Sequence, residues 1–212
     1  MSYERHLNGL YVITDDNLTE DETCFSKVEQ SLLGGASVIQ LRDKINDNYI
    51  VKQKANKLQH LCRKYNALFV LNDNIEVAMD IRCDGLHIGK NDYDKFKSVR
   101  RFFNGVIGVS CYGDIENAKR FEKLGANYVA FGSFFNSPTK PDSSLVPLDI
   151  LSKARRELKI PVCAIGGINY QNINSVMEHN PHMVSTISDI WKSENITTKA
   201  SFYTNQFKRE SA

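Results

Sequence analysis

The sequence lacks long hydrophobic runs, and its longest unbroken apolar stretch is Ala67–Leu71. A stretch of this length is far too short to cross a bilayer, so we expect no membrane span. The first residues also lack the apolar core of a secretory signal peptide, and we expect none. The net charge of +2 gives no bulk attraction to nucleic acid or to an anionic membrane. Any preference for anions therefore has to come from a local site.

Cysteine is scarce, and the five cysteines show neither paired spacing nor the spacing of metal ligands. They are Cys24, Cys62, Cys83, Cys111 and Cys163. Reduced thiols in a cytoplasmic protein are the expected state. The sequence also has no Gly-x-Ser-x-Gly elbow, no Gly-x-Gly-x-x-Gly fingerprint and no Walker loop. These absences argue against the serine hydrolases, the dinucleotide-binding folds and the P-loop enzymes.

No linker, low-complexity tract or break in composition divides the chain, so we expect a single domain over residues 1–212. Its content of 42% hydrophobic and 25% charged residues is that of an ordinary soluble globular protein. A chain of this length fits one domain and lies close to the lower limit for an eight-fold barrel.

Eight short apolar runs alternate with amphipathic, helix-like stretches. The runs are Gly9–Ile13, Ala36–Leu41, Ala67–Leu71, Gly85–Ile88, Gly105–Val109, Tyr128–Phe131, Pro161–Ile165 and Met183–Ile187. They show no clean alternation of apolar and polar residues, as expected for strands that are buried on both faces. Eight strand–helix units in succession predict an α/β fold, the closed parallel (β/α)8 or TIM barrel. We expect the residues after about Ser193 to form a last helix that closes the ring.

Polar residues follow most of these runs, where the strands of a barrel end and its active site lies. In the first such group, Gln40, Arg42 and Lys44 alternate and can share one face of an extended chain. An amide and two cations there would form an anion seat, although an exposed, charged strand end is the simpler interpretation. Asn72-Asp73 and Asp92 follow the next two runs. Their two carboxylates, facing one cavity, would suit Mg²⁺, which takes further ligands from water and phosphate.

A second anion seat is indicated further along the chain. Gly166-Gly167 and Ser188 follow the seventh and eighth runs, the positions at which barrels most often bind phosphate. The long connection between Phe134 and Pro147 adds Ser137, Thr139 and Lys140, and a loop of this length on the active face is typical of a lid. His87 is interpreted as a packed strand histidine, and His60, His179 and His182 as surface residues.

Charge balance links the two seats. Arg42, Lys44 and Lys140 supply about +3, Mg²⁺ adds about +2, and Asp73 with Asp92 subtract about 2. The remainder of roughly +3 balances an ionised diphosphate ester, whose charge is close to −3. A separate phosphate seat implies a second phosphorylated substrate. The pattern therefore predicts a transfer reaction in which diphosphate leaves.

Several segments, taken together in order and spacing, resemble the thiamine phosphate synthase family from Tyr11 to Ser188. They are Ile39–Lys44, Leu71-Asn72-Asp73, Asp84–Gly89 with Asp92, Gly108-Val109-Ser110, Thr139-Lys140 and Ala164–Ile168. The resemblance implies a transferase that joins a pyrimidinylmethyl diphosphate to a thiazole phosphate or its carboxylate, giving thiamine phosphate and diphosphate. Its substrates would be these small molecules, with neither nucleic acid nor a membrane as partner. A homodimer is compatible with it, but the residues carry no signal of oligomeric state.

The resemblance also implies roles for individual residues. Arg42, Lys44, Asn72 and Lys140 would hold the diphosphate, Asp73 and Asp92 would bind Mg²⁺, Gln40 and Ser110 would contact the pyrimidine, and Ser137, Thr139, Gly167 and Ser188 would hold the thiazole phosphate. Of these, Arg42, Lys44, Ser110 and Lys140 are the expected catalytic residues. Catalysis would rest on charge stabilisation and alignment, with little acid–base chemistry.

The sequence departs from the family pattern in places that keep two alternatives open. Lys90, Tyr112, Ser133 and Asp189 stand where glutamine, histidine, proline and a small apolar residue are usual. A thiazole tautomerase on the same barrel would use a histidine at the position of Tyr112. A non-catalytic, phosphate-binding barrel would be consistent with Asp189, because a carboxylate beside Ser188 would oppose a phosphate. As a third interpretation, Asp189 caps a helix and leaves the site untouched.

Overall fold

The computed structural model describes residues 6–137 and 144–208. Within these ranges the chain forms eight parallel strands that close into a barrel in sequence order, β1 through β8, with β8 paired to β1. The strands are β1 Gly9–Ile13, β2 Val38–Leu41, β3 Leu68–Asn72, β4 Gly85–Ile88, β5 Val106–Tyr112, β6 Tyr128–Phe131, β7 Val162–Ala164 and β8 Met183–Thr186. The predicted TIM barrel is confirmed.

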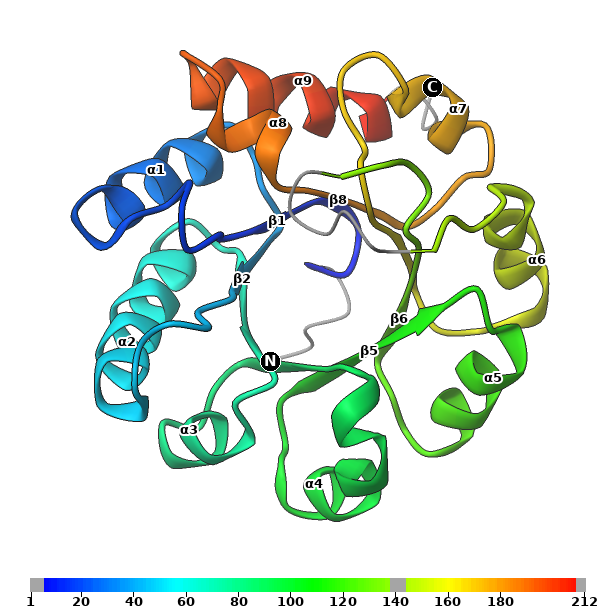
Figure 1. The fold of residues 1–212 in the computed structure, drawn as a ribbon, viewed down its shortest axis with the longest axis horizontal. Helices are drawn as coiled ribbons and strands as arrows, with labels where there is room; N and C mark the ends of the chain where they lie inside the picture. The colour runs from blue at the N-terminus through cyan, green and yellow to red at the C-terminus, as the bar shows by residue number, and fades with distance from the viewer. Residues whose placement is uncertain (1–5, 138–143, 209–212) are drawn as a thin grey trace.

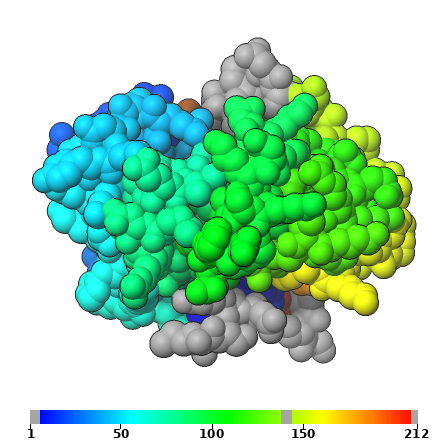
Figure 2. Space-filling model, turned by 90° about the horizontal axis from the view of Figure 1, so that it is seen from below, coloured from blue at the N-terminus to red at the C-terminus, as the bar shows by residue number. Residues whose placement is uncertain are grey.

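Helices surround the barrel as an outer ring in chain order (Figure 1). They are α1 Asp21–Leu33, α2 Asn48–Lys64, α3 Ile75–Asp80, η2 Lys90–Lys95, α4 Phe96–Phe102, α5 Ile115–Lys123, α6 Asp149–Glu157, α7 Ile173–Met177, α8 Ser188–Trp191 and α9 Ile196–Lys208. Figure 2 shows one side of this ring, where the cyan and green segments pack side by side. In the described part of the chain, no helix has the length and apolar character that a membrane crossing requires.

Individual helices begin and pack as their sequences dictate. Asp114 caps α5 by accepting a hydrogen bond from the Asn117 N–H at 2.9 Å. In α2, the apolar residues Val51, Ala55 and Leu58, spaced by four and three positions, form one stripe that is buried against the sheet. Helix packing therefore follows the helical period of the apolar residues.

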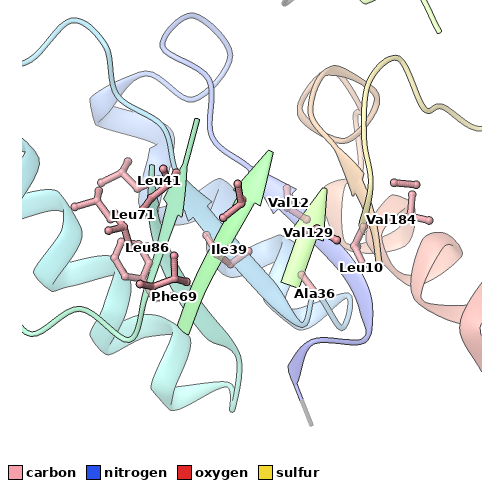
Figure 3. Close-up of a cluster of buried hydrophobic side chains, with 14 of the residues drawn as sticks. Leu10, Val12, Ala36, Ile39, Leu41, Phe69, Leu71, Leu86, Val129 and Val184 are labelled. Carbon is pink, nitrogen blue, oxygen red and sulfur yellow. The ribbon is translucent and has the colours of Figure 1, made fainter. Parts of the chain in front are cut away.

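Apolar side chains fill two layers separated by the sheet. One lies inside the barrel and includes Tyr11 and Tyr128. The larger one lies between the strands and the helices, and Figure 3 shows part of it, with Leu10, Val12 and Ile39 among the labelled residues. Because both faces of each strand are buried, the strands read as continuous apolar runs. The sheet is thus a rigid platform for the loops at its ends.

Two expectations about reactive side chains have different outcomes. All five cysteines are buried and free, and burial raises the pKa of the Cys111 thiol to about 12, which does not suit a nucleophile. The placement of His182 on the surface is wrong, because it is half-buried and accepts a hydrogen bond from the Val162 N–H at 3.0 Å. Its polar partners come from β7 and, through Arg155, from α6, whose position relative to β8 cannot be inferred from local sequence.

Candidate functional site

A cavity of about 770 Å³ opens at the carboxyl ends of the strands. It is lined by ten of the residues singled out from the sequence: Gln40, Arg42, Lys44, Asn72, Asp73, Asp92, Ser110, Ser137, Gly167 and Ser188. These residues come from loops and strand ends spread over most of the chain, and the barrel brings them around one space. The two remaining candidates, Thr139 and Lys140, lie outside the described residues.

The segment after β2 sends its charges in alternate directions. Arg42 and Lys44 line the cavity, whereas the Asp43 carboxylate turns away and accepts a hydrogen bond from Lys54 of α2 at 2.6 Å. Burial alone would raise the pKa of Asp43, but the hydrogen bonds from Lys54 and Asn46 outweigh it and lower that pKa. Lys54 thus pairs with the one acidic residue of the segment, and the two residues that the segment turns toward the cavity are both cations, with Asp16 3.7 Å from Arg42 and Asp73 2.6 Å from Lys44.

Asp73 is held in the cavity wall by three donors. Lys44 Nζ and Asn72 Nδ2 donate to Oδ2 at 2.6 and 2.8 Å, and the Gly89 N–H donates to Oδ1 at 3.2 Å. Burial would raise the pKa of this carboxyl, but Lys44, together with His87 and Asn72, outweighs it, so the pKa lies below its usual value. Asp73 has a φ of 59°, in the left-handed region that aspartate tolerates. A fixed, ionised carboxylate results.

Asp92 also lines the cavity and belongs to η2, the short helix that follows β4. Its Oδ1 accepts a hydrogen bond from Lys95 Nζ at 2.7 Å, and its side chain is 18% exposed. The next residue, Tyr93, donates from its hydroxyl group to the backbone carbonyl of Ser110. The segment that carries Asp92 is therefore attached to the end of β5.

The donor chemistry of Asp73 and Asp92 suits a hard divalent cation. Both are carboxylates on one cavity, and each oxygen keeps lone pairs beyond those used by its lysine or amide donor. Within the described residues, no group of three or more His, Cys, Asp or Glu side chains could hold a metal. Two carboxylates fit Mg²⁺, which commonly takes few protein ligands and completes its shell with water and phosphate oxygens.

The opposite wall is formed by tightly packed glycine turns. Gly166 and Gly167 follow β7 with φ values of 102° and 67°, and a Cβ atom at either would overlap the β6 loop at Ser133 or Phe135. The Phe135 N–H also donates to the Gly166 carbonyl at 3.0 Å. Only glycine fits this close approach. The Gly167 backbone thus lies at the cavity surface beside Ser188, where N–H groups and a hydroxyl group can meet an anion.

Residues that sequence reasoning passed over also line the cavity, among them Tyr11 and His87. His87 is buried, as expected, but its Nε2 lies 2.8 Å from Ser110 Oγ. The signal that could have found it is strand register, since His87 pairs with Asn72 and shares the inward face of the barrel. Tyr11 could have been found in the same way, because it lies two positions before Ile13 on β1 and therefore shares the inward face of the barrel with it.

Asp189 does not line the cavity. Its carboxylate accepts a hydrogen bond from the Tyr203 hydroxyl group at 2.6 Å and lies 3.4 Å from Lys199 Nζ, and both partners belong to α9. The sequence placed it beside an anion seat because it follows Ser188 directly. The turn into α8 directs the two side chains differently, and the carboxylate attaches α8 to the last helix.

Comparisons with known proteins agree with this geometry. A family model described as Thiamine monophosphate synthase matches residues 10–190. A thiamine-phosphate synthase of Thermoplasma acidophilum is 37% identical over 187 residues, covering 88% of this chain and 86% of the relative. One of Wolinella succinogenes is 37% identical over 189 residues, covering 89% and 87%. A solved structure, thiamine phosphate pyrophosphorylase from Pyrococcus furiosus, has a TM-score of 0.86 at 31% identity and covers 97% of this chain and 98% of that one.

Proposed function

The chain belongs to the thiamine monophosphate synthase family, and from this premise we propose that its cavity is divided into three adjoining subsites. The enzyme is a transferase of thiamine biosynthesis that joins a pyrimidinylmethyl diphosphate to a thiazole phosphate and releases diphosphate.

The first subsite holds the diphosphate with Arg42, Lys44 and Asn72. The observation that carries this assignment is the alternation after β2, which turns two cations toward the cavity and the intervening Asp43 away from it. Arg42 presents a planar fork of donors that matches phosphate oxygens, and Lys44 adds a compact charge. Lys140, outside the described residues, is proposed to add a third cation from the long loop.

Asp73 and Asp92 would hold Mg²⁺ at the edge of this subsite. When bound, the ion would neutralise charge on the diphosphate oxygens. Each carboxylate has a lysine partner within 2.7 Å, with which a bound ion would compete. The fit rests on this donor set.

The second subsite holds the pyrimidine ring between Gln40 and Ser110, and the third holds the thiazole phosphate. In the third, Ser137, Thr139 and Ser188 offer hydroxyl groups and Gly167 offers backbone N–H at a turn that admits no side chain. Thr139 lies outside the described residues. The two phosphorylated groups would thus approach from opposite walls of one cavity, which brings the thiazole ring to the pyrimidine methylene.

The chemical step asks little of acids and bases. As the C–O bond to the diphosphate breaks, positive charge develops on the pyrimidine methylene and negative charge on the leaving oxygen. Arg42 and Lys44 stabilise that oxygen, and the thiazole nitrogen donates its electron pair to the methylene carbon. Fixed cations stabilise developing charge without reorganising during the step, which makes preorganisation the main source of rate.

The metal assignment is tested by Asp92→Ala, with Asp94→Ala as the matched control. Asp94 lies two residues away, is exposed and does not line the cavity. We expect Asp92→Ala to abolish nearly all formation of thiamine phosphate from the two substrates in Mg²⁺ and to melt as the wild type does. Asp94→Ala should keep wild-type activity. Full activity of Asp92→Ala throughout a Mg²⁺ titration would remove Asp92 from the metal site.

The same assay separates the enzyme from its two rivals. A tautomerase would convert a thiazole substrate without consuming the pyrimidine diphosphate, and it would use a histidine where this chain has the exposed Tyr112. A non-catalytic barrel would bind thiazole phosphate and release no diphosphate. Its main support was Asp189, and that carboxylate is engaged by Tyr203 on α9.

A further inference from the structure

A continuous series of hydrogen bonds crosses the barrel interior along the floor of the cavity. Gln40 Nε2 donates to the Tyr11 hydroxyl oxygen at 2.7 Å, and the Tyr11 and Tyr128 hydroxyl oxygens lie 2.7 Å apart. The Tyr128 hydroxyl oxygen lies 2.9 Å from His87 Nδ1, and His87 Nε2 lies 2.8 Å from Ser110 Oγ. The chain thus joins the two residues proposed to contact the pyrimidine, which have no direct bond to each other.

The barrel provides space for Tyr128 at the centre of this series of hydrogen bonds. Tyr128 is fully buried and does not line the cavity, whereas Tyr11, His87, Gln40 and Ser110 are part of its lining. Gly108 on β5 faces the Tyr128 ring, and a Cβ atom there would overlap that ring. A glycine inside a strand weakens the sheet, so its presence here is explained by the aromatic ring that needs the room.

The direction of each hydrogen bond follows from the donors at one end. Gln40 Nε2 can only donate, so the Tyr11 oxygen accepts and its own proton goes to the Tyr128 oxygen. Burial raises the pKa of both tyrosines far above the usual value, so both hydroxyl groups keep their protons. Tyr128 then donates to His87 Nδ1, which leaves the imidazole proton on Nε2, facing Ser110. In the reverse direction, the Tyr11 oxygen would accept from both Gln40 and Tyr128, and neither of these two hydrogen bonds would use its own proton.

Gln40 and Ser110, at the two ends of this series of hydrogen bonds, are each thereby left with one hydrogen-bonding role toward a ligand. With its Nε2 bound to Tyr11, Gln40 leaves Oε1 as an acceptor, and Ser110, which accepts from His87, can donate its own proton to a ligand. We propose that Tyr11, Tyr128 and His87 are positioning residues that set Gln40 as the acceptor and Ser110 as the donor of the pyrimidine seat. An aminopyrimidine offers the complement, an exocyclic amino donor beside a ring-nitrogen acceptor. This inference rests on the proposed seat of the pyrimidine between Gln40 and Ser110.

Fixing these roles before the substrate arrives has a kinetic consequence. A free glutamine amide can rotate and exchange its donor and acceptor ends, and a free serine hydroxyl group can turn to any acceptor. The series of hydrogen bonds through Tyr11, Tyr128 and His87, called the relay below, holds the Gln40 amide and the Ser110 hydroxyl group in place before the substrate binds. The entropic cost of fixing these two groups is then no longer part of the binding step. The effect of the relay should fall on the pyrimidine substrate alone, because the thiazole phosphate subsite is built from other loops.

The direction of the relay is tested without any assay of activity. Nitrogen-15 NMR of protein labelled at its five histidines distinguishes the two neutral tautomers, and a His87→Gln variant assigns the His87 signals. We expect the Nε2–H tautomer in the wild type, and a mixture or the other tautomer in Tyr128→Phe. An Nδ1–H or doubly protonated His87 in the wild type would overturn the relay, whatever the enzyme proves to catalyse.

Its role is tested by the kinetics of Tyr128→Phe and Tyr11→Phe, which keep the rings and remove single hydroxyl groups. Loss of one buried hydrogen bond should raise the KM of the pyrimidine diphosphate about five- to tenfold and leave the KM of the thiazole phosphate unchanged. Tyr203→Phe is the matched control, since the Tyr203 hydroxyl group donates to Asp189 and takes no part in this series of hydrogen bonds.

The possible results are distinct. Equal rises of both KM values, or a lower melting temperature with no change in either, would reduce the relay to a packing feature and contradict the proposal. If the wild type forms no thiamine phosphate, the proposed function fails, while the tautomer measurement still decides the direction of the hydrogen bonds.

Discussion

Thr186, at the end of β8, carries a buried hydroxyl group for which the described residues offer no hydrogen-bond partner. Val184 and Met183, two and three residues earlier, belong to the outer and inner apolar layers, so alternation directs the Thr186 side chain toward the helices, although the residue also lines the cavity. A buried hydroxyl group without a partner gives up its hydrogen bonds to water and forms none in the protein, which lowers the stability of the fold. Thr186 is therefore a position at which the fold has retained a destabilising group.

We expect Thr186→Val, which keeps the shape of the side chain, to raise the free energy of unfolding by about 1 kcal/mol. Urea unfolding measures this, and kcat should stay at the wild-type value. Thr197→Val is the control, because the Thr197 hydroxyl group donates to the Gln30 carbonyl at 3.0 Å and its loss should destabilise. A less stable and less active Thr186→Val protein would mean that a substrate or a rearranged loop uses the hydroxyl group.

Asp189 illustrates the opposite case, a charged residue beside the site whose bonds lead away from it. Asp189→Asn should weaken the bonds to Tyr203 and Lys199 and lower the free energy of unfolding by about 1–2 kcal/mol. Affinity for thiazole phosphate should not change, because the carboxylate does not line the cavity. Isothermal titration beside a melting curve tests both statements. Tighter binding would restore the idea of competition with phosphate.

At the scale of elements, His182 connects α6 to the β7–β8 pair. Its Nδ1 accepts from the Val162 N–H, and the Arg155 guanidinium of α6 lies against the ring, 3.0 Å from Nδ1. Burial, and then the charge of Arg155, lower the pKa of His182 from 6.5 to about 4. The histidine is therefore neutral in the folded protein over a range in which the unfolded chain binds a proton.

This difference predicts a pH dependence of stability. The contribution of neutral His182 is complete above pH 6.5 and is lost as pH falls toward about 4, because protonation then favours the unfolded chain. His182→Asn, whose Oδ1 can replace Nδ1 as acceptor, should show a shallower decline. Urea unfolding of both proteins at several pH values between these limits gives the comparison. Parallel curves would show that another group dominates acid destabilisation.

The elements that could be predicted from the sequence are those fixed by local pattern. The strands Gly9–Ile13, Gly85–Ile88 and Tyr128–Phe131 match the predicted runs residue for residue, because turn residues border them. β5 continues to Tyr112, past its predicted end at Val109, since the register shift near Ser110 depends on pairing with β6. The alternation after β2 placed Arg42 and Lys44 together, although both lie beyond the strand. The alternation of side chains could therefore be predicted more reliably than the residues at which strands end.

At the scale of the molecule, the parts that local pattern could not supply are contacts between distant elements. The bond between Tyr11 and Tyr128 joins residues 117 positions apart across the barrel. The partners of Asp189 lie on α9, and the two acidic partners of Lys54 lie on α1 and on the loop after β2. Barrel closure dictates that such pairs meet, but which polar atoms meet depends on how side chains fill the interior. The candidate site was visible as a set, and its internal bonds were not.

These internal bonds pair both proposed metal ligands with lysines, of which Lys44 lines the cavity and Lys95 is an exposed residue outside its lining. Lys44 lies 2.6 Å from Asp73, and Lys95 lies 2.7 Å from Asp92. A divalent cation at the carboxylates competes with these lysines, and a diphosphate offers the displaced lysines a new partner. Each ligand should therefore strengthen the binding of the other, and linkage makes the two effects equal.

Lys95→Met tests this coupling, with Lys97→Met, which removes an exposed lysine of α4, as the control. Removing the partner of Asp92 should raise the affinity for Mg²⁺ alone about two- to fivefold, the size expected for an exposed ion pair. It should also reduce the further stabilisation that inorganic diphosphate adds. Melting temperatures with Mg²⁺, with diphosphate and with both measure the coupling. Because Mg²⁺ and diphosphate also combine in solution, the informative quantity is the difference in coupling between variants. Equal coupling in Lys95→Met, Lys97→Met and wild type would show that Lys95 does not compete with the cation.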